Sequence, residues 1–144
     1  MVRKIKKILV PLDGSKNSLR GLDEAISLAR QCHAIITAIY AKQYPPAFVL
    51  HPLGFMGIDF KKEGKKILGP VKTRAAKHGI HLIYKIIGSN DPRYDIVRFA
   101  HSRKNKFDLI VIGARGRGIV KDLFFGSVSD YVVHKSKIPV LVVK

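Results

Sequence analysis

The sequence lacks the cysteine pairs that are typical of extracellular proteins and the long apolar runs that are typical of membrane proteins. Cys32 is its one cysteine, so no internal disulfide can form and a reducing cytoplasmic location is expected. No apolar run approaches the ~20 residues that a membrane-spanning helix requires. Low-complexity linkers and internal repeats are also absent. We therefore expect a single domain over residues 1–144 with no membrane partner.

Acidic residues are scarce as well, and the chain carries a large excess of positive charge. Ten Asp and Glu oppose 27 Lys and Arg, which gives a net charge of +17. Such a charge attracts polyanions, although solvated helix faces also account for basic residues that are spread along a chain. A nucleic-acid-binding module therefore stays open as an alternative. Because no helix-turn-helix, RRM-type or zinc pattern is present, its binding is expected to be weak, salt-sensitive and blind to sequence.

Five apolar runs alternate with segments of helical periodicity. They are typical of strands, and several are apolar on both faces, which indicates a parallel sheet covered by helices on both sides. The order of elements is βαβαβαβαβ, an α/β fold. The expected strands are Ile8–Leu12, Ala34–Ala41, Ile80–Ile87, Phe107–Ile112 and Ile138–Val143.

The segments between the strands contain helix-start signals and helix breakers. Asn17 or Ser18 is a suitable N-cap for the first helix. The second helix, Lys61–Lys77, contains Gly69-Pro70, which should kink or split it. The remaining helices are expected after Asn90-Asp91-Pro92 and near Ser127–Lys135, and a loop is expected over 42–58.

In an open parallel sheet, ligands bind beyond the carboxyl ends of the strands, where the direction of winding reverses. For the common strand order 3-2-1-4-5, this point lies between strands one and four. The segments that meet there are Pro11–Ser15 and Gly113–Gly116.

Glycines mark the second of these segments. Gly113 and Gly116 let the backbone approach a bound anion and permit positive φ. Arg115 adds positive charge between them. The alternative is that this segment binds no anion and is only a turn between a strand and a helix, in which the glycines supply the required backbone angles. Neither a Walker sequence nor GxGxxG with an acidic residue ~20 positions later is present.

A helix start follows at Gly126-Ser127. Its free N–H groups and positive dipole end suit a phosphate, and the hydroxyls of Ser127 and Ser129 would add donors. Across the switch point, Asp13 ends the first strand. Its carboxylate could accept a ribose hydroxyl or hold Mg²⁺, or it could cap the following turn, as Asp-Gly-Ser often does.

The spacing Gly113-x2-Gly116-x9-Gly126-Ser127 resembles the nucleotide signature of the ATP-binding universal stress proteins. This resemblance covers nearly the whole chain and is weakest over Lys42–Lys61. It implies a Rossmann-like, five-stranded parallel sheet, with ATP (or ADP or AMP) and Mg²⁺ or Mn²⁺ in the switch-point cleft. The other similar segments are Val10–Ser15, Ser18–Ala25, Phe107–Gly113, Gly126–Val132 and Ile138–Val143.

Carried onto matching positions, the resemblance implies that Asp13 contacts the ribose and that the backbone at Leu12 and Ala41 borders the adenine. Pro11 precedes them in the same segment and belongs to the expected site. The implied role is a nucleotide-responsive regulator of the stress response with an unknown protein partner. The expected phosphate contacts are Gly113, Arg115, Gly116, Gly126, Ser127, Val128 and Ser129; Arg117 lies outside the signature.

Efficient catalysis is not expected, because no water-positioning residue can be named. The histidines have no zinc-site spacing, and His33, His78 and His81 lie near strand starts, away from the cleft. The other candidates are unsuitably placed, namely Cys32 at the end of the first helix, Asp108 at the start of strand four and Asp122 in the glycine segment, where an acid would repel phosphate.

The last strand predicts a homodimer. In the order 3-2-1-4-5 it is a sheet edge, and Ile138–Val143 carries no charge before Lys144. Proteins normally cover or charge such an edge. Antiparallel pairing of two copies about a two-fold axis would cover it.

Overall fold

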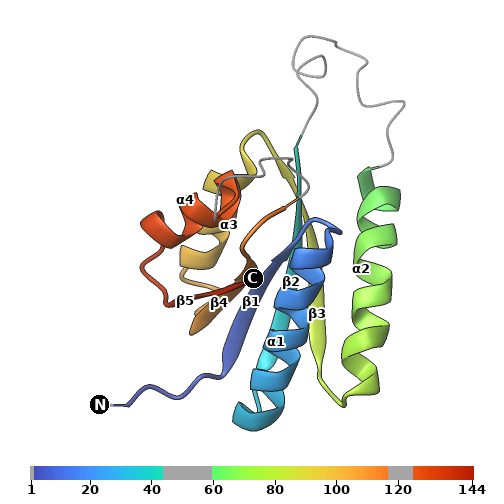
Figure 1. Ribbon diagram of the computed structural model, residues 1–144, viewed down its shortest axis with the longest axis vertical. Helices are drawn as coiled ribbons and strands as arrows, with labels where there is room; N and C mark the ends of the chain where they lie inside the picture. Colours follow the sequence, from blue (N-terminus) through green and yellow to red (C-terminus); the bar gives the residue numbers. More distant parts are fainter. Residues whose placement is uncertain (1, 44–59, 117–124) are drawn as a thin grey trace.

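The computed structural model is a five-stranded parallel sheet with two helices on each face (Figure 1). It describes residues 2–43, 60–116 and 125–144. The strand order is β3-β2-β1-β4-β5, as predicted. The elements are β1 (Lys7–Leu12), α1 (Lys16–Cys32), β2 (Ile35–Gln43), α2 (Phe60–Lys77), β3 (Leu82–Ser89), α3 (Pro92–His101), β4 (Leu109–Gly113), α4 (Ser127–Lys135) and β5 (Val140–Val143).

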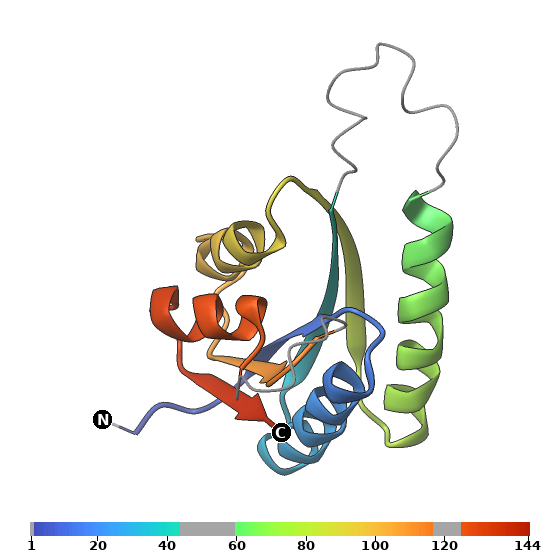
Figure 2. The ribbon, with the colours of Figure 1, turned by 45° about the horizontal axis from the view of Figure 1, so that its top comes forward.

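The alternation of side chains along β1 divides the core into two layers. Ile8, Val10 and Leu12 pack with α1 and α2 on one face of the sheet. Leu9 belongs to the other layer, beneath α3 and α4. Figure 2 shows the sheet between these two pairs of helices. Because β1 is central and buried on both faces, its carboxyl end is held firmly where the winding direction reverses.

The start of α1 differs from the prediction. Ser15, not Asn17 or Ser18, is the N-cap: it has extended backbone angles, and its Oγ accepts a hydrogen bond from Ser18 N at 3.1 Å. The turn is made by Gly14, whose φ of 81° is in the left-handed region. The Ser18 hydroxyl instead donates to the carbonyl of Ser15 at 2.9 Å, so it braces the cap from inside the helix.

The predicted break in α2 is absent, since the helix continues through Pro70. Leu68, Val71 and Ala75 are buried on either side of the proline. Figures 1 and 2 show α2 as one continuous helix, and these residues pack it against the sheet. The predicted start of α3 is confirmed: Asp91 is its N-cap and accepts from Arg93 N at 3.1 Å.

The predicted loop over 42–58 was wrong at its start, because Lys42 and Gln43 extend β2 and pair with β3. The rest of that loop, 44–58, lies outside the described residues. Cys32 is a free thiol that packs against the core, as expected. Within the described ranges, no helix is both long enough and apolar enough to cross a bilayer.

Candidate functional site

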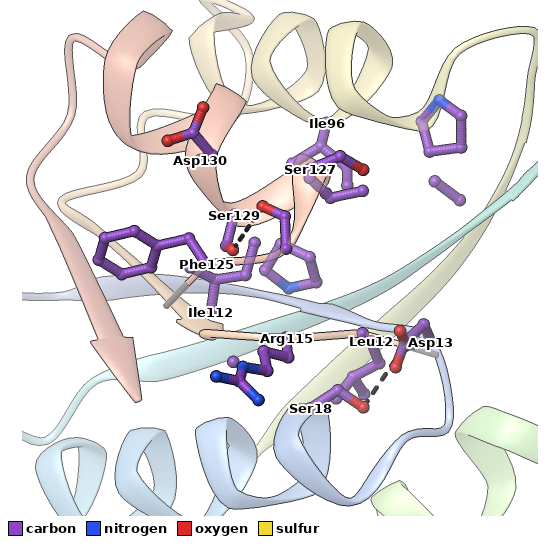
Figure 3. Close-up of a pocket in the computed structure, with 17 residues that line it drawn as sticks. Leu12, Asp13, Ser18, Ile96, Ile112, Arg115, Phe125, Ser127, Ser129 and Asp130 are labelled. Atoms are coloured by element: carbon purple, nitrogen blue, oxygen red, sulfur yellow. Dashed lines mark hydrogen bonds between the residues drawn. The ribbon is translucent and has the colours of Figure 1, made fainter. Parts of the chain in front are cut away.

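A cavity of about 680 Å³ opens at the carboxyl ends of β1 and β4 (Figure 3). It lies at the switch point, because β1 and β4 are neighbours whose connecting helices cover opposite faces. All eleven residues that the sequence predicted line this one cavity: Pro11, Leu12, Asp13, Ala41, Gly113, Arg115, Gly116, Gly126, Ser127, Val128 and Ser129.

The end of β1 brings a carboxylate to one side of the cavity. Asp13 Oδ1 accepts a hydrogen bond from Ser15 N at 2.8 Å, so the turn-capping role is present. The other oxygen faces the glycine loop, since a Cβ built on Gly116 would lie 2.5 Å from Asp13 Oδ2. The carboxylate therefore closes the turn with one oxygen and presents the other to the loop after β4.

The two glycines of that loop serve different purposes. At Gly113 an added Cβ would lie 2.6 Å from the carbonyl oxygen of Asn17, so this glycine permits close packing of β4 against α1. Gly116 keeps the cavity clear beside Asp13. Neither of them uses the positive φ that a glycine permits, since the positive-φ glycines of the described chain are Gly14 and Gly79.

The start of α4 directs backbone donors into the cavity. Gly126 is the N-cap and offers no side-chain hydrogen bond to the helix. The amides of Ser127, Val128 and Ser129 are in the first turn, where an α-helix provides no acceptor, and no described residue accepts from them. Aligned amides at the positive end of a helix favour an anion.

The hydroxyl of Ser129 does not add the predicted donor. It is buried and donates to the carbonyl of Ala114 at 2.6 Å, with the carbonyl of Gly126 also 3.0 Å away. Gly126 N donates to the same Ala114 carbonyl at 2.6 Å. These bonds fasten the start of α4 to the end of β4. Ser127, in contrast, is exposed, so its hydroxyl can donate a hydrogen bond to a ligand or accept one from it.

Charged side chains lie on opposite sides of the cavity. Figure 3 shows Arg115 and Asp13 on the side next to α1, and Ser127 and Asp130 on the side of α4. Arg115 is exposed, which leaves its guanidinium able to reach a bound anion. Arg117 and Asp122 lie outside the described residues.

An apolar wall completes the cavity at its other end. Pro11 and Ala41 come from β1 and β2, and Pro92 and Ile96 come from the first turns of α3. A flat aromatic base is suited to such a wall, whereas a phosphate is not. The sequence analysis missed the contribution of α3, because only the fold brings this helix over β2 and beside the cavity.

The remaining missed residues are similarly inconspicuous in sequence. Ile112 and Phe125 flank the glycine loop, and Asp130 lies in the first turn of α4. Ser18 lies beneath the turn after β1, where its Oγ accepts from Asp13 N at 3.5 Å.

The described residues contain no group of three or more His, Cys, Asp or Glu that could hold a metal ion. His33, His78 and His81 lie at the ends of α1 and α2 and before β3, away from the cavity, as predicted. Asp108 also lies at the opposite end of β4, where it accepts from Lys6 N and Lys7 N at 2.9 and 3.0 Å.

The model of the Universal stress protein family matches residues 4–144. The chain belongs to the universal stress protein family. Among relatives in this family, it is 35% identical to universal stress protein MJ0531 of Methanocaldococcus jannaschii, over 96% of this chain and 82% of the relative. It is 31% identical to universal stress protein YxiE of Bacillus subtilis, over 96% and 98% of the two chains.

Solved universal stress proteins share the fold. UspA from Lactobacillus plantarum superposes with a TM-score of 0.81 at 26% identity, covering 99% of this chain and 100% of its own. A universal stress protein solved in complex with cAMP has a TM-score of 0.70 at 25% identity, covering 97% of each chain. The Archaeoglobus fulgidus protein in complex with dAMP has a TM-score of 0.74 at 24% identity, covering 99% and 100%.

Proposed function

We propose that this protein binds an adenine nucleotide, ATP or one of its products ADP and AMP, in the cavity at the ends of β1 and β4. The observation that carries the proposal is the convergence of all eleven predicted residues on one cavity with three open amides of α4. Related structures hold dAMP or cAMP, which are adenine nucleotides. The role we assign is that of a cytoplasmic, single-domain regulator of the stress response.

The two ends of the cavity suit the two ends of a nucleotide. We assign the adenine to the apolar end, against Leu12, Ala41 and Ile96. The phosphates would lie at the polar end, where charge-assisted hydrogen bonds from backbone amides are strong. The groups that we assign to them are Gly113, Arg115, Gly116, Gly126, Ser127, Val128 and Ser129.

Asp13 lies between these ends and would accept a bond from a ribose hydroxyl, or would help to hold Mg²⁺ or Mn²⁺ beside the phosphates. Hard cations of this kind take oxygen ligands and usually keep several waters. Since the described residues form no metal cluster of their own, such a cation would depend on the phosphates for most of its ligands. It would neutralise phosphate charge.

Little or no turnover is proposed. Efficient phosphoryl transfer needs a group that orients the attacking water. Of the carboxylates that line the described cavity, Asp13 accepts from Ser15 N, and Asp130 lies at the start of α4, 3.5 Å from His134 Nδ1. A slow ATPase is the nearest alternative to a purely binding protein.

Calorimetric titration with ATP and Mg²⁺ tests the proposal. Gly116→Val should lower the affinity at least tenfold, because its side chain would occupy the space beside Asp13 Oδ2. Gly69→Ala is the matched control, since a Cβ at this α2 glycine meets nothing within 4 Å, and its affinity should be unchanged. Wild-type affinity in a folded Gly116→Val protein, judged by circular dichroism, would contradict the site.

We also propose a homodimer through the edge strand β5, within the predicted segment Ile138–Val143. Val140, Leu141 and Val142 are each at least partly exposed although apolar, and β4 pairs with one side of the strand only. A second copy in antiparallel pairing would satisfy the free backbone groups of the other side. The cavity is built within one chain, so this proposal is independent of nucleotide binding.

A further inference from the structure

Positive charge gathers at the end of the molecule opposite the cavity. Because the sheet is parallel, the segment before β1 and the four helix-to-strand connections all lie at the amino ends of the strands. This is the lower end in Figure 1, where α1 and α2 finish. Seven Lys and Arg occur there with one acid, Asp108, within residues 2–6, 33–34, 78–81, 102–108 and 136–139.

Hydrogen bonds join these segments into one continuous edge. Each segment is bonded to the next across the sheet, so these bonds hold the segments side by side. The bonds are Ile36 N to His81 O (3.3 Å), Ile35 N to Lys6 O (2.9 Å), Asp108 N to Lys7 O (2.9 Å), Lys7 Nζ to Asn105 O (3.3 Å) and Lys137 N to His101 Nε2 (2.9 Å).

The one acid of this edge is already engaged. Asp108 accepts from the amides of Lys6 and Lys7, and it pairs with Arg3 at 3.0 Å. The other cations are exposed and have no ion pair with a described acid. We call them the amino-end row: Lys4, Lys6, Arg103, Lys104, Lys106 and Lys137.

We propose that the amino-end row binds the phosphodiester backbone of nucleic acid without reading its sequence. Neighbouring strands lie about 4.8 Å apart, so a row in front of the three adjacent strands β1, β4 and β5 extends roughly 10 Å. A line of cations of this length faces several phosphates of a duplex, which carries one charge per about 1.7 Å of its axis when both strands are counted. Sequence-blind phosphate binding of this kind is typically weak, with a Kd of about 10⁻⁴–10⁻⁶ M at physiological salt.

An acidic membrane is the less suitable partner. Stable attachment through a basic patch needs a second, apolar contribution. Over the segments that form this edge, Val2 is the one exposed large apolar side chain, and a single valine buries too little apolar surface to supply that contribution. Base-specific reading is not proposed, because it needs an element that enters a groove, and the row lies on short connections between elements.

The test measures binding of a fluorescent DNA duplex of arbitrary sequence by anisotropy between about 50 and 200 mM salt. The row variant carries Lys4→Gln, Lys6→Gln, Arg103→Gln and Lys104→Gln. The control variant removes four exposed charges from α1 and α2 by Arg20→Gln, Lys65→Gln, Lys66→Gln and Lys72→Gln. Both variants have the same net charge, so only the position of the loss differs.

Each phosphate contact contributes about 0.9 to the slope of log affinity against log salt for duplex DNA. The row variant should therefore lose about 3.6 from this slope and at least tenfold in affinity at low salt. The slope of log affinity against log salt should fall by less than about one unit in the control variant. Equal losses in the two variants, or no binding by wild type at about 50 mM salt, would overturn the proposal.

Two further measurements distinguish duplex binding at the row from binding in the cavity and from binding to a membrane. Saturating ATP should leave duplex binding unchanged, because the row and the cavity lie at opposite ends of the sheet. Competition by ATP would place the duplex in the cavity and would contradict the proposal that the amino-end row binds it. Tighter binding to vesicles of phosphatidylcholine and phosphatidylserine than to duplex, at the same salt, would overturn it in favour of a membrane.

Discussion

Gly113 and Gly116 are three residues apart, yet the structure uses the absence of their side chains in different ways. Gly113 lies against the backbone of α1, which cannot give way. Gly116 lies against one oxygen of the Asp13 side chain, at the edge of the cavity. Within this spacing, one glycine is therefore a packing residue and the other lines the cavity.

Substitution at the two glycines should separate stability from binding. Gly113→Ala should lower the free energy of unfolding by about 1–3 kcal/mol, because its Cβ would overlap the carbonyl of Asn17. Gly116→Ala should change it by less, since the Asp13 side chain can turn aside. Urea denaturation measures both. Equal stability of Gly113→Ala and wild type would show that α1 does not pack as closely as described.

Asp108 gives a second prediction at this scale. Burial raises the pKa of this carboxyl, but the amides of Lys6 and Lys7 and the charge of Arg3 outweigh burial and hold the pKa below its ordinary value. The ionised form is therefore more stable in the folded than in the unfolded protein. Its contribution is complete above the unfolded pKa of about 3.9 and disappears as pH falls through the folded pKa.

Asp108→Asn should accordingly lower the free energy of unfolding by about 1–3 kcal/mol at neutral pH. The difference from wild type should shrink as pH is lowered below about 4. Urea denaturation at neutral and acidic pH checks both parts. A difference that stays constant with pH would mean that the charge of Asp108 contributes nothing.

At the scale of elements, α2 shows tertiary packing prevailing over local helix propensity. Glycine and proline are the two poorest helix formers, and α2 contains Gly64, Gly69 and Pro70. The buried positions Leu68, Val71 and Ala75 nevertheless hold it against the sheet. Helix stability in proteins comes mainly from such an apolar face.

The same helix allows a matched pair of substitutions. Gly69→Ala should change the free energy of unfolding by less than about 1 kcal/mol, because the new Cβ meets nothing within 4 Å beyond its chain neighbours, and the restriction that Pro70 places on the preceding residue offsets the helix preference of alanine. Gly64→Ala should be destabilising, since its Cβ would lie 2.4 Å from Ile86 Cδ1. Thermal unfolding of both variants measures the contrast. A stabilising Gly64→Ala would contradict the packing of α2 on β3.

At the scale of the whole molecule, the two ends of the sheet carry different chemistry. The carboxyl ends hold the cavity, with open amides and an apolar wall. The amino ends hold the amino-end row. A parallel sheet separates the two because every helix-to-strand connection returns to the same end. The protein could thus hold a nucleotide and a polyanion at once.

The dimer is tested at this scale. Leu141→Lys should yield monomers, because two copies would bring like charges together at β5. Leu141 is a better probe than Val142, which packs against the core of its own chain. Ile83→Lys on β3, the other edge strand, is the control, since Ile83 is 42% exposed and Leu141 is 37% exposed. Light scattering should show dimers of wild type and Ile83→Lys, and a monomeric wild type of 16.1 kDa would exclude the dimer.

The sequence by itself was sufficient for the order of elements and the strand order, and the eleven residues that its resemblance to the family implied for a nucleotide site all line one cavity. The order of elements has local causes, whereas the strand order is the common one for this architecture and the site residues follow from the resemblance. Apolar runs on both faces indicate buried parallel strands, and a parallel sheet brings its carboxyl ends together. A Gly-Ser pair before a helix, such as Gly126-Ser127, indicates open amides wherever the helix lies.

Only the tertiary structure decided how these residues are used. It turned the hydroxyl of Ser129 toward Ala114, it packed Gly113 against α1, and it brought Ile96 of α3 to the cavity. Each depends on a contact between elements that are distant in the sequence. Periodicity and capping signals describe neighbours along the chain, and they contain no information about which distant backbone atom lies within 3 Å of a side chain.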